Sequence, residues 1–230
     1  MLVEQNYILL IFNCEKYRYK AQKQKETWLK ELPSYLKYYH VLSLPASDRK
    51  SLTKSLTKSD SASGDYVFDD ETHTLRVNAP DDYNSLPKKV FAAYKAIHET
   101  FSYKYIFKTD DDQMLNNPKF FDMIIGLINR IGSIHYGGHI VSVPRPQVSK
   151  YWMIHPELPT NLVLKATQYC NGRFYLLSAG AIAYLLTKKK EIYREFFEDY
   201  AIGYHLDARQ FKTPILRINS DQFFSDIKYS

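Results

Sequence analysis

Apolar runs of strand length alternate with segments of helical spacing along most of the chain. Tyr7–Phe12 is continuously apolar, which is typical of a central strand that is covered on both faces. A charged helix is predicted over Glu15–Leu32, and a second strand over Tyr39–Leu44. Together these segments would form a first strand–helix–strand unit, the repeating element of a parallel sheet.

The second half of the chain continues this alternation. Leu86–Phe101 carries apolar residues at helical spacing, and Tyr105–Phe107 is the apolar end of a strand. The further predicted elements are a helix that begins at Pro118, strands at Tyr136–Val143, Phe174–Leu177 and Pro214–Ile218, and helices at Ala179–Leu186 and Glu198–Leu206. This order predicts an α/β fold with a mostly parallel central sheet flanked by helices.

Two stretches lack a strand or helix pattern. Residues 46–65 are rich in Ser, Thr and Lys and have little to bury, so we expect a mobile surface loop there. Residues 145–172 are rich in Pro, Tyr and Trp, and we expect an irregular loop that faces a substrate. A length of 230 residues fits one domain over residues 1–230.

Composition narrows the classes of ligand and partner. The formal net charge is +6, which suits an anionic ligand such as a nucleotide diphosphate. The lysines are scattered and do not form a basic stripe with spaced aromatic residues, so nucleic acid is not an expected partner. The two cysteines cannot form a disulfide scaffold, although a single bridge stays possible in principle.

The sequence contains no apolar run of membrane-spanning length and no signal-peptide pattern. We therefore expect a soluble, cytoplasmic protein without a transmembrane segment. If the chain is an excised domain of an anchored enzyme, the Golgi lumen is the alternative location. Composition and pattern do not predict the oligomeric state.

The most informative motif is Asp110-Asp111-Asp112, which follows the strand that ends in Phe107-Lys108-Thr109. Three adjacent carboxylates repel one another unless a cation lies among them. Their oxygen ligands favour Mg²⁺ or Mn²⁺, and the carboxyl end of a strand is where open α/β sheets bind ligands. A solvated turn is the alternative interpretation, because Asp is also common in loops.

Several separated segments resemble, in the same order, the galactosyltransferase and Fringe-like β-1,3-glycosyltransferases of glycosyltransferase family 31. The resemblance covers residues 22 to 206. The matching segments are Lys25-Glu-Thr-Trp28, Asp81 to Lys89, Lys108 to Asp112, Pro144-Arg145 with Lys150-Tyr151, Tyr169-Cys-Asn-Gly172 with Tyr175 to Ser178, and Glu198 to Gly203. The resemblance implies the GT-A fold and a metal-dependent, inverting transfer from a UDP-sugar to a glycan or glycolipid, with a β-1,3-type linkage.

The resemblance also implies roles for residues in the matched motifs and at the end of the first strand. Asp112 would bind Mn²⁺ or Mg²⁺, and Asp110 and Asp111 would contact the ribose or complete the metal site. Asp199 would be the general base, with Glu198 as its partner. The other implied contacts are Asn13, Lys89 and Lys108 near the donor, and Tyr151, Trp152, Tyr169, Asn171 and Gly172 near the donor or acceptor sugar.

Alternatives stay open at several of these positions. Asp199 could only begin a helix, Lys89 could be solvated, and Trp152 could be ordinary packing. The chain also departs from the family pattern: Gly172-Arg173-Phe174 stands where many relatives have three glycines, and no His follows His205 to serve as a late metal ligand. The competing functions are a non-catalytic carbohydrate- or nucleotide-binding module and a metal-dependent nucleotidyl- or phosphoryltransferase.

Overall fold

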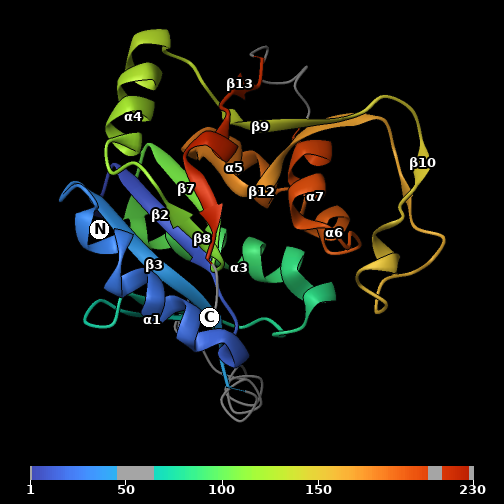
Figure 1. Cartoon of the computed structure of the whole chain (residues 1–230), viewed down its shortest axis with the longest axis horizontal. Coiled ribbons are helices and arrows are strands. Elements are labelled where there is room, and N and C mark those ends of the chain that lie inside the picture. Colours follow the sequence, from blue (N-terminus) through green and yellow to red (C-terminus); the bar gives the residue numbers. More distant parts are fainter. Residues whose placement is uncertain (1, 46–64, 207–213, 228–230) are drawn as a thin grey trace.

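The computed structural model describes residues 2–45, 65–206 and 214–227. Its main sheet has eight strands in the order β13-β9-β12-β7-β2-β3-β5-β4 (Figure 1). The strands are β1 Val3–Glu4, β2 Tyr7–Phe12, β3 Leu36–Ser43, β4 Tyr66–Asp69, β5 Thr74–Val77, β6 Phe101–Ser102, β7 Tyr105–Asp110, β8 Gln113–Leu115, β9 Tyr136–Val143, β10 Gln147–Val148, β11 Val163–Leu164, β12 Thr167–Ser178, β13 Leu216–Arg217 and β14 Phe224–Asp226.

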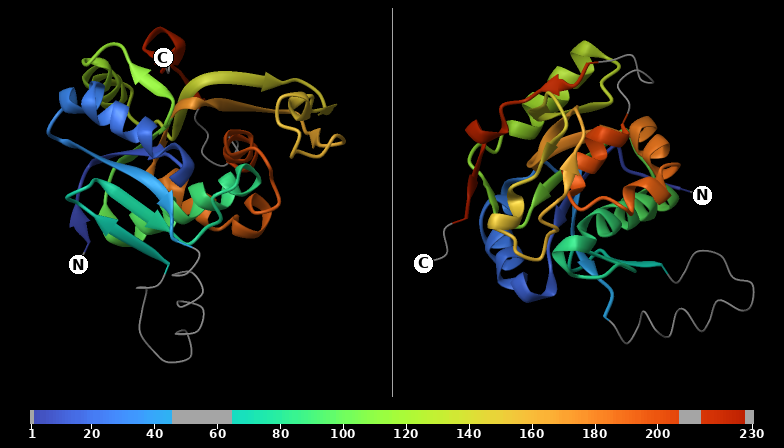
Figure 2. Two further views of the ribbon diagram at one scale, coloured as in Figure 1. Left: turned by 60° about the horizontal axis from the view of Figure 1, so that its bottom comes forward. Right: turned by 90° about the vertical axis from the view of Figure 1, so that its right-hand side faces the viewer.

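Helices cover the sheet on both faces (Figures 1 and 2). The α-helices are α1 Arg18–Glu26, α3 Leu86–Thr100, α4 Phe120–Ile131, α5 Ala179–Leu186, α6 Lys189–Ile192 and α7 Glu198–His205. Short 3-10 helices are η1 Glu15–Tyr17, η2 Trp28–Glu31, η3 Tyr83–Ser85, η4 Tyr151–Met153 and η5 Ser220–Gln222. The expected α/β class is therefore confirmed.

Four of the seven pairings in the main sheet are parallel, so the sheet is mostly parallel as expected. The strands β7, β2, β3 and β5 form one parallel block. The strand β12 runs antiparallel to both β7 and β9. Because β12 runs back past the carboxyl end of β7, its first half lies beside the acid cluster.

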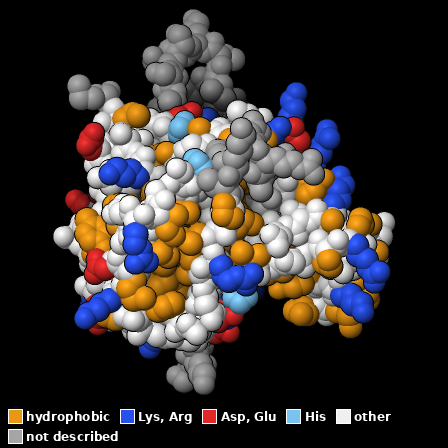
Figure 3. Space-filling model, turned by 90° about the horizontal axis from the view of Figure 1, so that it is seen from above, with side chains coloured by type: hydrophobic (Ala, Val, Ile, Leu, Met, Phe, Trp, Pro, Cys, Tyr) orange, Lys and Arg blue, Asp and Glu red, His pale blue; other side chains and the backbone are white. Residues whose placement is uncertain are grey.

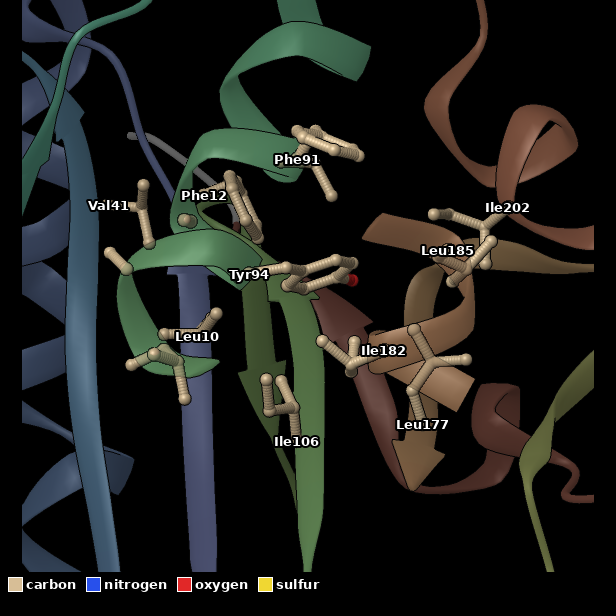
Figure 4. Close-up of a cluster of buried hydrophobic side chains, with 14 of the residues drawn as sticks. Leu10, Phe12, Val41, Phe91, Tyr94, Ile106, Leu177, Ile182, Leu185 and Ile202 are labelled. Carbon is tan, nitrogen blue, oxygen red and sulfur yellow. The ribbon is translucent and has the colours of Figure 1, made fainter. Parts of the chain in front are cut away.

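Two buried clusters lie on opposite faces of the sheet, and β2 contributes alternate residues to both. Ile8, Leu10 and Phe12 join a cluster with α3 and α5, part of which Figure 4 shows. Tyr7, Leu9 and Ile11 face η2 and α4 on the other side. All six residues of β2 are buried, which explains why this strand is apolar without alternation.

Several predicted boundaries are wrong for identifiable reasons. The expected helix over Glu15–Leu32 is divided into η1, α1 and η2, because the chain leaves helical geometry at Thr27, whose hydroxyl bonds to the Lys23 carbonyl at 2.7 Å. The second strand begins at Leu36, three residues before its predicted start. The β4–β5 hairpin was not predicted at all.

The expectation of an irregular segment over residues 145–172 is partly wrong. Its end, from Thr167 onward, belongs to β12, because these polar residues pair in register with β9 and the pairing shifts between Cys170 and Tyr175. The predicted loop at residues 46–65 lies outside the described residues except for Asp65.

Close packing of α7 on β12 gives a test of the fold. A Cβ atom at Gly203 would lie 2.6 Å from the Tyr169 Cα and 2.8 Å from the Gln168 carbonyl oxygen, and backbone atoms cannot rotate away. We expect Gly203→Ala to lower the free energy of unfolding by about 2–3 kcal/mol in urea denaturation. Gly126→Ala is the matched control, since a Cβ there meets nothing within 4 Å and alanine favours the helix. Equal stability of the two variants would contradict this packing.

Candidate active site

The carboxyl ends of β2 and β7 place the acid cluster at the mouth of a cavity of about 780 Å³. In the parallel register Phe12 lies beside Asp110, so Asn13 and the cluster leave adjacent strands at the same edge. The Asn13 side chain is buried, and neither of its polar atoms has a hydrogen-bond partner within the described part of the chain. Such an amide is available to a ligand that enters the cavity.

Lys108 is the buried cation at the centre of the site. Its Nζ lies 2.7 Å from Asp110 Oδ1 and 2.5 Å from Glu198 Oε1, and it donates to the Gly172 carbonyl at 2.9 Å. Burial disfavours the charged amine, but the two carboxylates outweigh it and raise the pKa of Lys108. Lys108 therefore stays protonated and ties β7 to β12 and α7.

The second acid of the cluster turns toward α1. Lys20 Nζ donates to Asp111 Oδ1 at 3.1 Å, and both side chains are largely buried. Burial raises the pKa of Asp111 to about 6, against the opposing effect of Lys20. Gln24, one turn farther along α1, donates to the Asp110 and Gln113 carbonyls and fixes the turn that follows β7.

The last acid of the cluster meets the C-terminal strand of the described chain. Gln113 Nε2 donates to Asp112 Oδ1 at 2.8 Å and to Asp226 Oδ1 at 3.1 Å, which brings these two carboxylates to one amide. The pairing of β14 with β8 produces this contact. Arg173 lines the cavity and also donates to Asp226, at 2.9 Å, so it ties β14 to β12.

Lys89 faces inward, and the interpretation of a solvated lysine is wrong. It is buried, and its Nζ contacts the Asn13 carbonyl and Asp81 Oδ1, the latter at 2.6 Å. Asp81 in turn accepts from the Glu15 backbone N–H at 2.9 Å. These contacts join α3 to the ends of β2 and η1, so Lys89 supports the wall of the cavity.

Glu198 and Asp199 begin α7 and face the same cavity from the side opposite α1. The Gly172 backbone N–H donates to Asp199 Oδ2 at 3.2 Å. Burial raises the pKa of both carboxyls, and that of Glu198 rises to about 7 even though Lys108 opposes the shift. Asp199 thus lies in the first turn of α7 with its carboxylate held by the Gly172 N–H.

An aromatic stack forms the rim between the cavity and the segment at residues 144–166. The His155 ring stacks on Tyr83 at 4.3 Å and on Tyr151 at 5.6 Å between ring centroids. Asn84 also donates to the Glu157 carbonyl at 3.3 Å. Tyr151 accordingly lines the cavity at its outer edge.

The structure brings most of the predicted site residues together. The predicted residues that line the cavity are Asn13, Lys89, Lys108, Asp110, Asp111, Asp112, Tyr151, Asn171, Gly172, Glu198 and Asp199. Trp152 and Tyr169 do not line it. Trp152 is partly exposed on η4, and Tyr169 packs against Tyr200 and Gly203 of α7.

Sequence reasoning missed several residues of the cavity, notably Lys16, Lys20, Tyr83, His155 and the neighbour Asp226. Lys16 and Lys20 are four residues apart just after the first strand, a spacing that would have placed them on one helical face. Asp226 gave no local signal, because its contact with Gln113 spans more than one hundred residues.

Comparison with known proteins now gives the family. A sequence model of the galactosyltransferase family matches residues 21–216. The chain belongs to the galactosyltransferase family. The match agrees with the resemblance that the motifs had indicated, whereas a search of curated protein sequences gives no match.

Solved structures similar to this chain are also glycosyltransferases. An active-site mutant of LgtC is 12% identical, with a TM-score of 0.47 and coverage of 93% of this chain and 73% of that one. GlyE from Streptococcus pneumoniae TIGR4 is 11% identical, with a TM-score of 0.43 and coverage of 95% and 46%. Mouse xyloside xylosyltransferase 1 is 10% identical, with a TM-score of 0.37 and coverage of 94% and 84%. This chain thus spans about half the length of the GlyE structure.

The buried Glu198 predicts a pH dependence of stability in this enzyme. Its folded pKa of about 7 exceeds the ordinary value of 4.5, so the folded state holds the proton more tightly. The resulting stabilisation is present below pH 4.5 and is lost as the pH rises through 7. When the pH is raised from 5 to 8, we therefore expect the unfolding free energy of wild type to fall by roughly 1–3 kcal/mol relative to that of Glu198→Gln.

Urea denaturation at the two pH values measures this difference. Glu191→Gln is the matched control, because Glu191 is exposed on α6 and its substitution is expected to leave the pH dependence unchanged. A wild-type stability that rises from pH 5 to pH 8 relative to Glu198→Gln would show that the Lys108 ion pair outweighs burial.

Proposed function

We propose that this chain is a metal-dependent, inverting glycosyltransferase of the GT-A fold that moves a sugar from a UDP-sugar donor to a hydroxyl of a glycan or glycolipid. The linkage would be of the β-1,3 type, by resemblance to the family. One observation carries the proposal: two groups of carboxylates line one cavity, the Asp110–Asp112 cluster at the end of β7 and the Glu198–Asp199 pair at the start of α7, and they meet at the Lys108 ammonium.

The charge of the cavity supports a requirement for a metal. Among the described residues that line it, eight are acidic and five are basic, a formal charge of −3 with His155 neutral. The protein as a whole carries +6, so its positive charge is not concentrated where an anionic donor would bind. A diphosphate would be repelled from this cavity unless a cation accompanied it.

The side chains fit a metal that shares its ligands with the substrate. Within the described residues, no three His, Cys, Asp or Glu side chains form a complete protein cage. Mg²⁺ is usually held by one or two carboxylates together with substrate phosphates and water, and Mn²⁺ also accepts oxygen ligands. Asp112 and Asp110 would supply the carboxylates, and Asp226 is the next candidate because it shares the Gln113 amide with Asp112.

The remaining steps belong to the protein. When bound, the metal would offset the negative charge that develops on the departing diphosphate. Asp199 would accept the proton of the acceptor hydroxyl while that oxygen bonds to the anomeric carbon, opposite the leaving group. The Gly172 N–H holds the Asp199 carboxylate in place, and the buried Asn13 amide is available to the nucleotide. Lys108 would keep Asp110 and Glu198 at fixed positions next to each other.

Removal of the Asp112 carboxylate should abolish the metal-dependent part of UDP binding. Isothermal titration calorimetry of UDP with and without Mn²⁺ measures it, and wild type is expected to bind weakly without the metal. Asp226→Ala should weaken the Mn²⁺-dependent affinity at least tenfold if this carboxylate supports the site. Asp221→Ala is the control, because Asp221 pairs with Arg173 but makes no contact with Gln113. UDP binding that is equally tight without Mn²⁺ would refute the role given to Asp112.

Asp199→Asn should lower turnover at least a hundredfold while Mn²⁺-dependent UDP binding stays within about twofold of wild type. The assay is Mn²⁺-dependent hydrolysis across a panel of UDP-sugars, in which water replaces the acceptor. Asn keeps the shape and can still accept from the Gly172 N–H, so a purely structural role at the start of α7 would leave turnover intact. Absence of hydrolysis for every donor, together with retained UDP binding, would instead favour a non-catalytic binding module.

A further inference from the structure

Residues 144–166 form an arm that projects from β9 and β12 beyond the helices (Figures 1 and 2). Its outer part exposes a run of apolar side chains on and after η4. Met153 and Ile154 are 67% and 72% exposed, and Tyr151 and Trp152 precede them. Four consecutive large apolar residues in this state are unusual for a surface that contacts only water.

A second apolar pair lies on the ribbon of the same arm. Val148 and Val163 are direct partners in the antiparallel β10–β11 pairing and are 53% and 54% exposed. Directly opposed residues of an antiparallel pair point to the same side of the ribbon. The arm therefore exposes apolar groups along its length as well as at η4.

The charged side chains of the arm are mainly basic. Arg145, Lys150 and Lys165 are exposed, and Glu157 is the single acidic residue of residues 144–166, all of which are described. The formal charge of the arm is thus +2. Figure 3, in which the arm forms the lobe at the right, shows hydrophobic and basic side chains together on it.

We propose that this arm binds the interfacial region of an anionic lipid bilayer. Apolar side chains flanked by Lys and Arg bind such surfaces through apolar burial and attraction to anionic headgroups. Tyr and Trp are the residues that prefer the headgroup level, and both occur at η4. A protein partner would have to cover the apolar groups and match three cations as well, whereas a bilayer with anionic lipids supplies both properties everywhere on its surface. None of the helices that the structure describes is both long and apolar enough to cross a bilayer, so the binding would be at the surface.

The arm is also mechanically joined to the catalytic cavity. Tyr151 belongs to η4 and stacks on His155, which stacks in turn on Tyr83 of η3, just before α3. A bilayer under the arm would therefore lie beside the cavity mouth. Membrane binding itself does not depend on the proposed reaction, so the two can be tested separately.

Co-sedimentation with vesicles tests the proposal. We expect the protein to bind vesicles of phosphatidylcholine with phosphatidylglycerol and to bind pure phosphatidylcholine much more weakly. Met153→Ser with Ile154→Ser should reduce binding at least tenfold. Lys150→Gln should reduce binding to the anionic vesicles about fivefold. None of these three residues lines the cavity, so UDP-sugar hydrolysis should stay at the wild-type rate.

The matched control removes the same two residue types elsewhere on the surface. Met123 and Ile131 on α4 are 48% and 50% exposed, and Met123→Ser with Ile131→Ser should leave vesicle binding unchanged. Trp152 gives an independent signal, since the chain has two tryptophans and Trp28 is buried. Brominated lipids should quench the fluorescence of Trp152 in bound protein.

Three results would overturn the proposal. The first is the absence of binding to anionic vesicles, and the second is an equal loss of binding in the α4 control. The third is a self-association that Met153→Ser with Ile154→Ser abolishes in sedimentation equilibrium, since a second copy of the chain would then cover the arm. A donor-hydrolysis assay that fails while vesicle binding persists would refute the proposed reaction and leave the membrane surface standing.

Discussion

One buried ammonium, that of Lys108, determines how the two halves of the site are arranged. A buried charge is costly unless it is paired, and Lys108 is paired on two sides by Asp110 and Glu198 and bonded to the Gly172 carbonyl. These partners belong to β7, α7 and β12. The position of the acid cluster relative to the start of α7 therefore depends on the contacts of one side chain.

The same pairing leaves negative charge unbalanced. One ammonium cannot neutralise two carboxylates, and the Lys20, Lys89 and Arg173 cations are each engaged with other acids at the wall of the cavity. The raised pKa values of Asp110, Asp111, Glu198 and Asp199 reflect first burial and then this crowding. The acids at the carboxyl end of the central strands therefore give the cavity a negative formal charge, which would repel a diphosphate that arrived without a cation.

The sequence predicts those parts of the fold whose stability is local or whose burial is complete. Tyr7–Phe12 is apolar throughout and Tyr136–Val143 at half of its positions, and the bounds of both strands are predicted to the residue. The segment Thr167–Asn171 is polar and becomes a strand only because β9 supplies its pairing, so no local pattern could have indicated it. The β14 strand is similar, since it is defined by its partner β8.

The residues of the candidate site also fall into those that the sequence predicts and those that it does not. Charged residues in motifs, such as Asp110 to Asp112 and Glu198, were assigned to one region through the resemblance to the family, and they do line one cavity. Aromatic residues carry no such constraint, and Tyr151 and Trp152 are neighbours with opposite outcomes: one lines the cavity and the other does not. The direction in which Tyr151 points from η4 is set by its packing against two other rings. Phe197 lies just before α7, and His155 lies farther along the arm.

Arg173 shows how a departure from the family pattern can be absorbed by the fold. Glycine at this position would leave the edge of the cavity open, whereas the guanidinium of Arg173 bonds to Asp226 and to the Phe224 carbonyl and lies 3.4 Å from Asp221. Arg173 thus places one positive charge between two carboxylates, a group of three with a formal charge of −1. The gain is a fixed position for Asp226 beside Asp112. Arg173 therefore ties β12 to β14 and holds the Asp226 carboxylate at the Gln113 amide that also binds Asp112.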